Sequence, residues 1–237
     1  MKLVEIQKEL PLSGFPQPNL HELKKDWESY LSHLTKLIPD IHIEDKGEVV
    51  YLGELSPGCR MCKDGKWDCV FTTVRCNLSC PFCINPKSIP EDYAGSAFGS
   101  NPEEILGNYS STDIQGISFS GGEPFTNPQK LLRWVKSFRH RMPTCYMWIY
   151  TNGILVTKNV LSALAGLGIN EIRFNTAASG YDNPLVLENI SHAVKEIPSV
   201  TVEIPVIPAH FPKLIQTVEI WSDIGIQYLN LHELMYE

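Results

Sequence analysis

Three cysteines stand close together in the run Arg75-Cys76-Asn77-Leu78-Ser79-Cys80-Pro81-Phe82-Cys83. Cys76, Cys80 and Cys83 follow an apolar segment that reads as a strand, and one short loop with this spacing can direct all three sulfurs to a common centre. Iron–sulfur clusters are held by thiolates, usually four. A loop with three thiols therefore leaves one iron of a cubane cluster with an open coordination position, as a catalytic zinc keeps one for its substrate. The alternative is a zinc knuckle completed by a distant fourth ligand.

The motif Cys-x3-Cys-x-Phe-Cys resembles the cluster loop of the radical S-adenosylmethionine (SAM) enzymes, in which an aromatic residue, here Phe82, precedes the third cysteine. A second element of that family, Gly121-Gly122-Glu123-Pro124, follows a strand-like segment further along the chain. The resemblance implies that these four residues bind the amino group of the methionine moiety of SAM. Glycines suit this task because, without a Cβ, they let the backbone approach a ligand. A side chain at Gly122 is therefore expected to impair SAM binding and to leave the cluster in place.

Length and composition fit one enzyme-sized core. The chain has 237 residues, of which 43% are hydrophobic and 20% charged, and it contains no low-complexity run. No stretch of about 18 apolar residues is present, and the first residues lack the apolar core of a signal peptide. Seven cysteines without an export signal favour metal binding over disulfides, so we expect a cytoplasmic protein with no membrane partner.

The net charge of −7, from 20 basic and 27 acidic residues, argues against a nucleic-acid partner, because proteins that bind nucleic acids usually present a basic face. The densest basic cluster is Arg133, Lys136, Arg139, His140 and Arg141. It falls on one predicted helix and around its carboxyl end, where cations are favourable to the helix dipole.

Short apolar strands alternate with amphipathic helices from about residue 68 onward. The predicted strands are 69–74, 116–120, 147–151, 171–176, 201–207 and 228–234, and the predicted helices are 102–109, 128–138, 158–167, 184–196 and 212–224. Three helices open with Asn-Pro, a strong N-cap followed by a residue preorganised for the first helical position. This alternation implies a parallel sheet and fits a doubly wound sheet as well as a barrel. Many members of the radical SAM family are six-stranded partial barrels, so the expected fold is α/β, a partial (β/α)6 TIM-like barrel.

Ligands of parallel α/β folds bind at the carboxyl ends of the strands, where all the candidate residues fall. Thr151-Asn152-Gly153 resembles an element that lines the cofactor pocket in the branch that activates glycyl radical enzymes; the alternative is a plain turn. Asn175 stands where relatives place a polar residue on the ribose, and His232 where they place a side chain near the adenosine. A solvated asparagine and a structural histidine are the corresponding alternatives.

A second group of cysteines, Cys59, Cys62 and Cys69, precedes the first. With Cys145 they could supply four thiolates to a structural zinc or an auxiliary cluster, at the amino-terminal rim of strands one and three. Those strands lie about 9–10 Å apart, which argues against the full set. The alternative is that they are buried thiols without metal.

Residues 1–67 are expected to form an N-terminal elaboration that carries this second cysteine site, and residues 68–237 the barrel. The apolar stripe of 21–37 predicts a helix that packs on the outside of the barrel. The chain ends just past the last strand, with no helix to cover it, which favours a longer parent protein over a covering partner.

The resemblance implies a radical SAM enzyme that holds a [4Fe-4S] cluster and reductively cleaves SAM to a 5′-deoxyadenosyl radical, which abstracts hydrogen from a small-molecule, peptide or protein substrate. The electron would come from a donor such as flavodoxin or ferredoxin. The block Gly58–Cys62 also resembles proteins of anaerobes related to pyruvate formate-lyase activating enzyme. The alternative is a non-catalytic iron–sulfur or zinc protein on the same barrel, which would have no use for a methionine-binding element at Gly121–Pro124.

Overall fold

The computed structural model describes residues 20–83, 101–109 and 113–234, and the chain divides into two compact units, Met1–Ser56 and Pro57–Glu237. In the first unit, helix α2 (Leu20–Leu37) precedes an antiparallel hairpin of β1 (Ile41–Glu44) and β2 (Val49–Leu52). The periodicity of the sequence predicts the helix but not the hairpin, whose strands have only four residues each. The expected packing of α2 on the barrel stays a prediction.

The second unit is built on a six-stranded parallel sheet. Its strands are β3 (Trp67–Thr73), β4 (Gly116–Gly121), β5 (Tyr146–Thr151), β6 (Glu171–Phe174), β7 (Ser199–Pro205) and β8 (Tyr228–His232). They lie in the order in which they occur along the chain, and every neighbouring pair is parallel. A doubly wound sheet reverses its strand order at a switch point, whereas a barrel does not. The order therefore selects the partial barrel.

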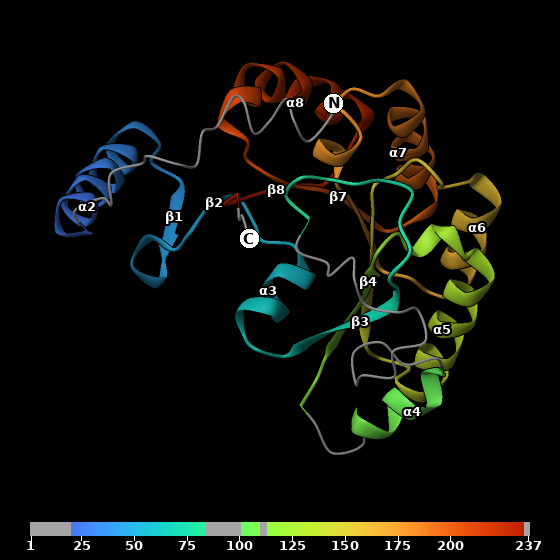
Figure 1. The fold of residues 1–237 in the computed structure, drawn as a ribbon. Helices are drawn as coiled ribbons and strands as arrows, with labels where there is room; N and C mark the ends of the chain where they lie inside the picture. Colours follow the sequence, from blue (N-terminus) through green and yellow to red (C-terminus); the bar gives the residue numbers. More distant parts are fainter. Residues whose placement is uncertain (1–19, 84–100, 110–112, 235–237) are drawn as a thin grey trace. The chain divides into compact units, whose positions relative to one another are not determined.

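Five helices connect the strands and lie along the outer face of the sheet (Figure 1). They are α4 (Pro102–Leu106), α5 (Pro128–Arg141), α6 (Lys158–Gly166), α7 (Pro184–Glu196) and α8 (Phe211–Ile224). The Asn-Pro starts are confirmed, because the side chains of Asn101, Asn127 and Asn183 each accept a backbone N–H of the first helical turn. None of the described helices is long and apolar enough to cross a membrane.

The hydrophobic core lies between the sheet and these outer helices. Ile117 and Phe119 of β4 and Met147 and Ile149 of β5 are fully buried there, and α5 contributes Trp134, among other side chains. Alternate residues of each strand therefore face this apolar layer, and the residues between them face the inner side of the sheet.

The inner side carries a short helix that the sequence analysis did not predict. The run Ser56-Pro57-Gly58 has the composition of a turn, but in the structure Pro57 begins helix α3 (Pro57–Lys63), which lies against the inner face (Figure 1). Gly58 allows this approach: a Cβ there would lie 2.4 Å from Nη2 of Arg173. A Cβ on Gly116 would likewise lie 2.8 Å from Sδ of Met61, so the helix and the sheet meet through small residues.

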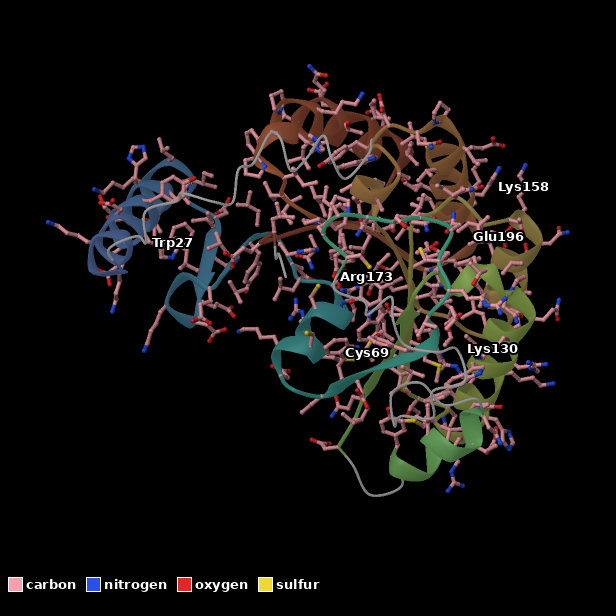
Figure 2. All side chains as sticks on the ribbon, in the orientation of Figure 1. Trp27, Cys69, Lys130, Lys158, Arg173 and Glu196 are labelled. Atoms are coloured by element: carbon pink, nitrogen blue, oxygen red, sulfur yellow. The ribbon has the colours of Figure 1, made fainter. Side chains whose placement is uncertain are left out.

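A buried ionic network occupies the inner face next to α3. The Arg173 guanidinium donates from Nε to Glu171 (2.7 Å) and from Nη1 to Glu203 (2.5 Å), and it stacks over the Trp148 ring. Glu171 also accepts hydrogen bonds from the hydroxyls of Tyr146 and Thr201. Burial alone lowers the pKa of Arg173, but the carboxylates raise it above its ordinary value, so the cation is held. Figure 2 shows Arg173 and Cys69 on this side of the sheet and Lys130, Lys158 and Glu196 on the outer helices.

Candidate functional site

The three cysteines of the first motif lie on the loop that leaves the carboxyl end of β3. Cys76 and Cys83 are exposed and Cys80 is half-buried. A tight turn joins the last two, with the Cys83 N–H donating to the Cys80 carbonyl (3.2 Å). The Leu78 N–H donates to Sγ of Cys76 (3.4 Å). Burial raises the pKa of the Cys76 thiol, and the Leu78 N–H opposes this by favouring the thiolate.

No three His, Cys, Asp or Glu side chains in the described part of the chain are gathered tightly enough to hold a single metal ion. A cubane cluster makes a different demand, because each thiolate ligates a different iron and the ligand sulfurs stand farther apart than around one ion. The donor set, three thiols on one exposed loop, fits such a cluster by its chemistry. Assignment of Cys76, Cys80 and Cys83 as its ligands stays a prediction.

The Gly-Gly-Glu-Pro turn lies directly against the chain that enters the cysteine loop. The Gly122 N–H donates to the Thr73 carbonyl and the Glu123 N–H to the Arg75 carbonyl, both at 2.7 Å. Gly121 has a φ of +114°, and a Cβ there would lie 2.1 Å from the Thr73 oxygen. A Cβ on Gly122 would lie 2.0 Å from the Arg75 oxygen. Both glycines are thus required by the fit between the two loops, and the two motifs form one backbone unit.

Glu123 is buried, and its carboxylate is used within the protein. Oε1 accepts from the Phe125 N–H (3.1 Å) and the Thr151 hydroxyl (2.9 Å), and Oε2 accepts from the Asn152 N–H (2.7 Å). The side chain therefore ties the end of β4 to the end of β5. Burial raises the pKa of Glu123 to about 7, although all three hydrogen bonds favour the ionised form. The contact with the methionine amino group stays a prediction.

This raised pKa predicts a pH-dependent stability. Since the pKa rises from 4.5 to about 7 on folding, the contribution of Glu123 is fully present below pH 4.5 and is lost as the pH rises through 7. The unfolding free energy of the native chain minus that of Glu123→Gln should fall by about 3 kcal/mol over this range. Urea titrations of the cluster-free proteins at a series of pH values measure it. A difference in unfolding free energy that does not change with pH would contradict the raised pKa of Glu123.

Asn152 connects β5 to the cysteine loop. Its side-chain NH2 group lies 2.8 Å from Oδ1 of Asn77 and 3.9 Å from Sγ of Cys76, and donates to both. The turn behind it is held from the other side by Asn189, whose amide donates to the Gly153 carbonyl (2.8 Å). The structure therefore brings Asn152 and the Gly-Gly-Glu-Pro turn to the same loop as Cys76.

The remaining candidate residues lie at the same end of the sheet but make local contacts. The Asn175 side chain accepts from the Ala178 N–H and caps a short 3-10 helix. His232, the exposed last residue of β8, lies 3.0 Å through Nδ1 from the Glu233 carbonyl. Phe82 is half-buried in the cysteine loop, and Pro124 is buried at the start of a 3-10 helix. Their roles toward a cofactor stay predictions.

The second group of cysteines is divided between different parts of the barrel unit. Cys59 and Cys62 lie on α3. Cys69 does not begin its strand, as the sequence analysis expected, but is its third residue, and burial raises its pKa to about 11. Cys145 packs in the outer core, on the opposite side of the sheet from α3. Because no three of these thiols form a metal-binding group in the described structure, a second metal stays a prediction.

Neither Asn77, which lies in the site, nor the buried ionic network of the inner face was predicted from the sequence. Asn77 lies inside the cysteine motif at a position the motif leaves open, so only its contact with Asn152 reveals it. The sequence did carry an indication of the buried ionic network. Glu171 and Arg173 are two positions apart in one predicted strand, and Thr201 and Glu203 are two positions apart in another. That spacing places each pair on one face of its strand.

The partial parallel barrel, with a three-thiol loop after its first strand and a Gly-Gly-Glu-Pro turn after its second, agrees with the resemblance to radical SAM proteins. Residues 57–163 match the family model described as a 4Fe-4S single cluster domain. Two solved structures have a similar fold. Coproporphyrinogen III oxidase of Escherichia coli, a radical SAM enzyme, matches with a TM-score of 0.53 and 13% identity, over 71% of this chain and 44% of that chain. The structure of anSMEcpe with bound SAM matches with a TM-score of 0.54 and 12% identity, over 72% of this chain and 52% of that chain. These folds confirm the partial barrel.

Relatives in sequence agree. A candidate glycyl-radical enzyme activating enzyme of Methanocaldococcus jannaschii is 24% identical over 77% of this chain and 51% of its own length. A PqqA peptide cyclase of Gluconobacter oxydans is 31% identical over 44% of this chain and 28% of its own length. The chain thus spans about half or less of the relatives it matches. These findings confirm the resemblance to the radical SAM proteins and, among them, to the glycyl-radical activating enzymes.

Proposed function

We infer that the protein is a radical SAM enzyme whose [4Fe-4S] cluster is held by Cys76, Cys80 and Cys83. The observation that carries this proposal is the backbone contact between the two motifs, in which the amides of Gly122 and Glu123 donate to carbonyls just before Cys76. A structural metal site needs no such turn beside it. The contact argues against the alternative, a non-catalytic iron–sulfur or zinc protein.

When bound, such a cluster supplies the electron that cleaves SAM to methionine and a 5′-deoxyadenosyl radical, which abstracts hydrogen from the substrate. The residues of the chain orient the cofactor and the substrate and exclude water from the site. The glycine turn gives a close approach of backbone, and buried Glu123 fixes that turn to Thr151 and Asn152. Asn175 and His232, at the ends of β6 and β8, are proposed to line the pocket for the nucleoside.

The substrate proposed is a peptide or protein, since the relatives are named as activating enzymes for glycyl-radical enzymes and as a peptide cyclase. A small electron-transfer protein such as flavodoxin or ferredoxin is proposed as the electron donor. The net charge of −7 argues against both a nucleic-acid substrate and a nucleic-acid partner.

The proposal is tested by anaerobic reconstitution with iron and sulfide, followed by reduction with dithionite in the presence of SAM. The native chain should take up about four irons on the three cysteines and form 5′-deoxyadenosine even without substrate. Cys80→Ala should lose this activity, because two thiols cannot position the open iron. Cys145→Ala is the matched control, since Cys145 lies in the outer core. Normal SAM cleavage by Cys80→Ala would refute the assignment.

A further inference from the structure

A chain of hydrogen bonds runs from the buried end of β4 to the first cysteine of the loop. Glu123 accepts the backbone N–H of Asn152 at 2.7 Å, and the Asn152 side chain donates to Asn77 at 2.8 Å and to Sγ of Cys76 at 3.9 Å. Glu123 and Asn152 are 1% and 6% exposed, so the hydrogen bond between them is held away from water. Hydrogen bonds are stronger in such an environment than at the surface.

The direction of these bonds matters for a thiolate. A thiolate only accepts hydrogen bonds, and two N–H groups point at Cys76: the Leu78 backbone N–H at 3.4 Å and the Asn152 side-chain amide. The nearby Asn77 carboxamide oxygen, 3.9 Å from the same sulfur, is an acceptor and would repel a thiolate. Asn152 donates to this oxygen too, which offsets its negative partial charge.

An N–H donor beside a ligand sulfur stabilises the more negative, reduced form of an iron–sulfur cluster, and hydrogen bonds to the sulfurs are one of the features that set its reduction potential. Asn152 directly follows β5, which is separate from the cysteine loop, so its bond also fixes the loop to the barrel. Glu123 makes this possible because it holds the Asn152 backbone and the Thr151 hydroxyl in the same buried position.

We propose that Asn152 is a positioning and tuning residue of the cluster: its carboxamide holds the Cys76–Asn77 end of the loop and raises the reduction potential of the cluster, and Glu123 acts through it as an anchor. This inference rests on the proposed function only for the presence of a cluster at Cys76. It assigns Glu123 a partner inside the protein that does not depend on SAM.

The test compares native protein, Asn152→Ala and the matched control Asn189→Ala after reconstitution. Asn189 holds the same turn through the Gly153 carbonyl (2.8 Å), so its loss removes a comparable bond that does not reach the cysteines. The readouts are iron per chain and the midpoint potential of the cluster, followed by EPR without SAM. We expect native iron content with a more negative potential in Asn152→Ala, and the native potential in Asn189→Ala. Equal potentials in all three would overturn the proposal while the cluster assignment stood.

A second readout needs no cluster. In the cluster-free proteins, amide hydrogen exchange of residues 75–80 should be faster in Asn152→Ala than in the native chain and unchanged in Asn189→Ala. The Asn152 side chain binds Asn77 and Cys76 of this loop, whereas the Asn189 side chain binds the Gly153 carbonyl. This comparison decides the positioning role if Asn152→Ala does not take up iron. Equal exchange would overturn that role. Failure of the native chain itself to take up iron would overturn the proposed function and, with it, the tuning role.

Discussion

Gly122→Ala should lose both cluster iron and SAM binding. The added Cβ would lie 2.0 Å from the Arg75 carbonyl oxygen and 2.7 Å from that of Val74, and both are backbone atoms that cannot turn aside as a side chain can. The chain that enters the cysteine loop must therefore move, at a cost of about 1–3 kcal/mol for overpacking. Iron per chain after reconstitution, and the change of the cluster spectrum on addition of SAM, measure the two losses.

The control is Gly166→Ala. Gly166 ends helix α6, and a Cβ there would meet nothing within 4 Å, so the same change should leave both readouts at native levels. Full iron uptake by Gly122→Ala with impaired SAM binding would instead restore the expectation drawn from the motif alone. Native iron content together with native SAM binding in Gly122→Ala would show that the Gly-Gly-Glu-Pro turn is not part of the site.

Arg173→Ala should destabilise the fold by about 3–5 kcal/mol, because it removes the cation that pairs with both Glu171 and Glu203. Glu171 is fully buried, and the Glu203 side chain is only 16% exposed. The loss is measured as the fall in the free energy of unfolding in urea. Arg173→Lys should recover part of it, since lysine restores the charge but not the planar fork that reaches both partners.

Lys213→Ala is the matched control for a charge at the surface. Lys213 pairs with Asp182, and the two side chains are 44% and 40% exposed, so its removal should change stability by about 0–1 kcal/mol. If Arg173→Ala changed the free energy of unfolding as little as Lys213→Ala does, the ionic network would not support the inner face of the barrel.

Local sequence signals predicted the outer half of the barrel well. The Asn-Pro starts, the apolar strands and the order of strand and helix are local features, and all six strands and five outer helices lie where these features indicate. The alternation could not decide between barrel and doubly wound sheet, because that depends on which strands pair. Helix α3 was missed because Pro57 and Gly58 are typical of turns, and Gly58 is used here for close contact with Arg173.

The site was predicted by its residues but not by its contacts. The motifs identified the cysteine loop and the glycine turn, and the parallel sheet places both at one rim. Motif spacing carried no information on the partners of Glu123, which depend on the register between β4 and β5. It therefore could not show that a side chain at Gly122 would reach the cysteine loop as well as the ligand.

The EPR spectrum of the reduced cluster, recorded without and with SAM, tests the central claim most directly. In a reconstituted chain with about four irons, three thiolates leave one iron open, so SAM should change the spectrum by binding there. Cys80→Ala should show no such change. A native chain that holds a reducible four-iron cluster whose spectrum is the same with and without SAM would contradict the claim that the cysteine loop and the Gly-Gly-Glu-Pro turn form one site.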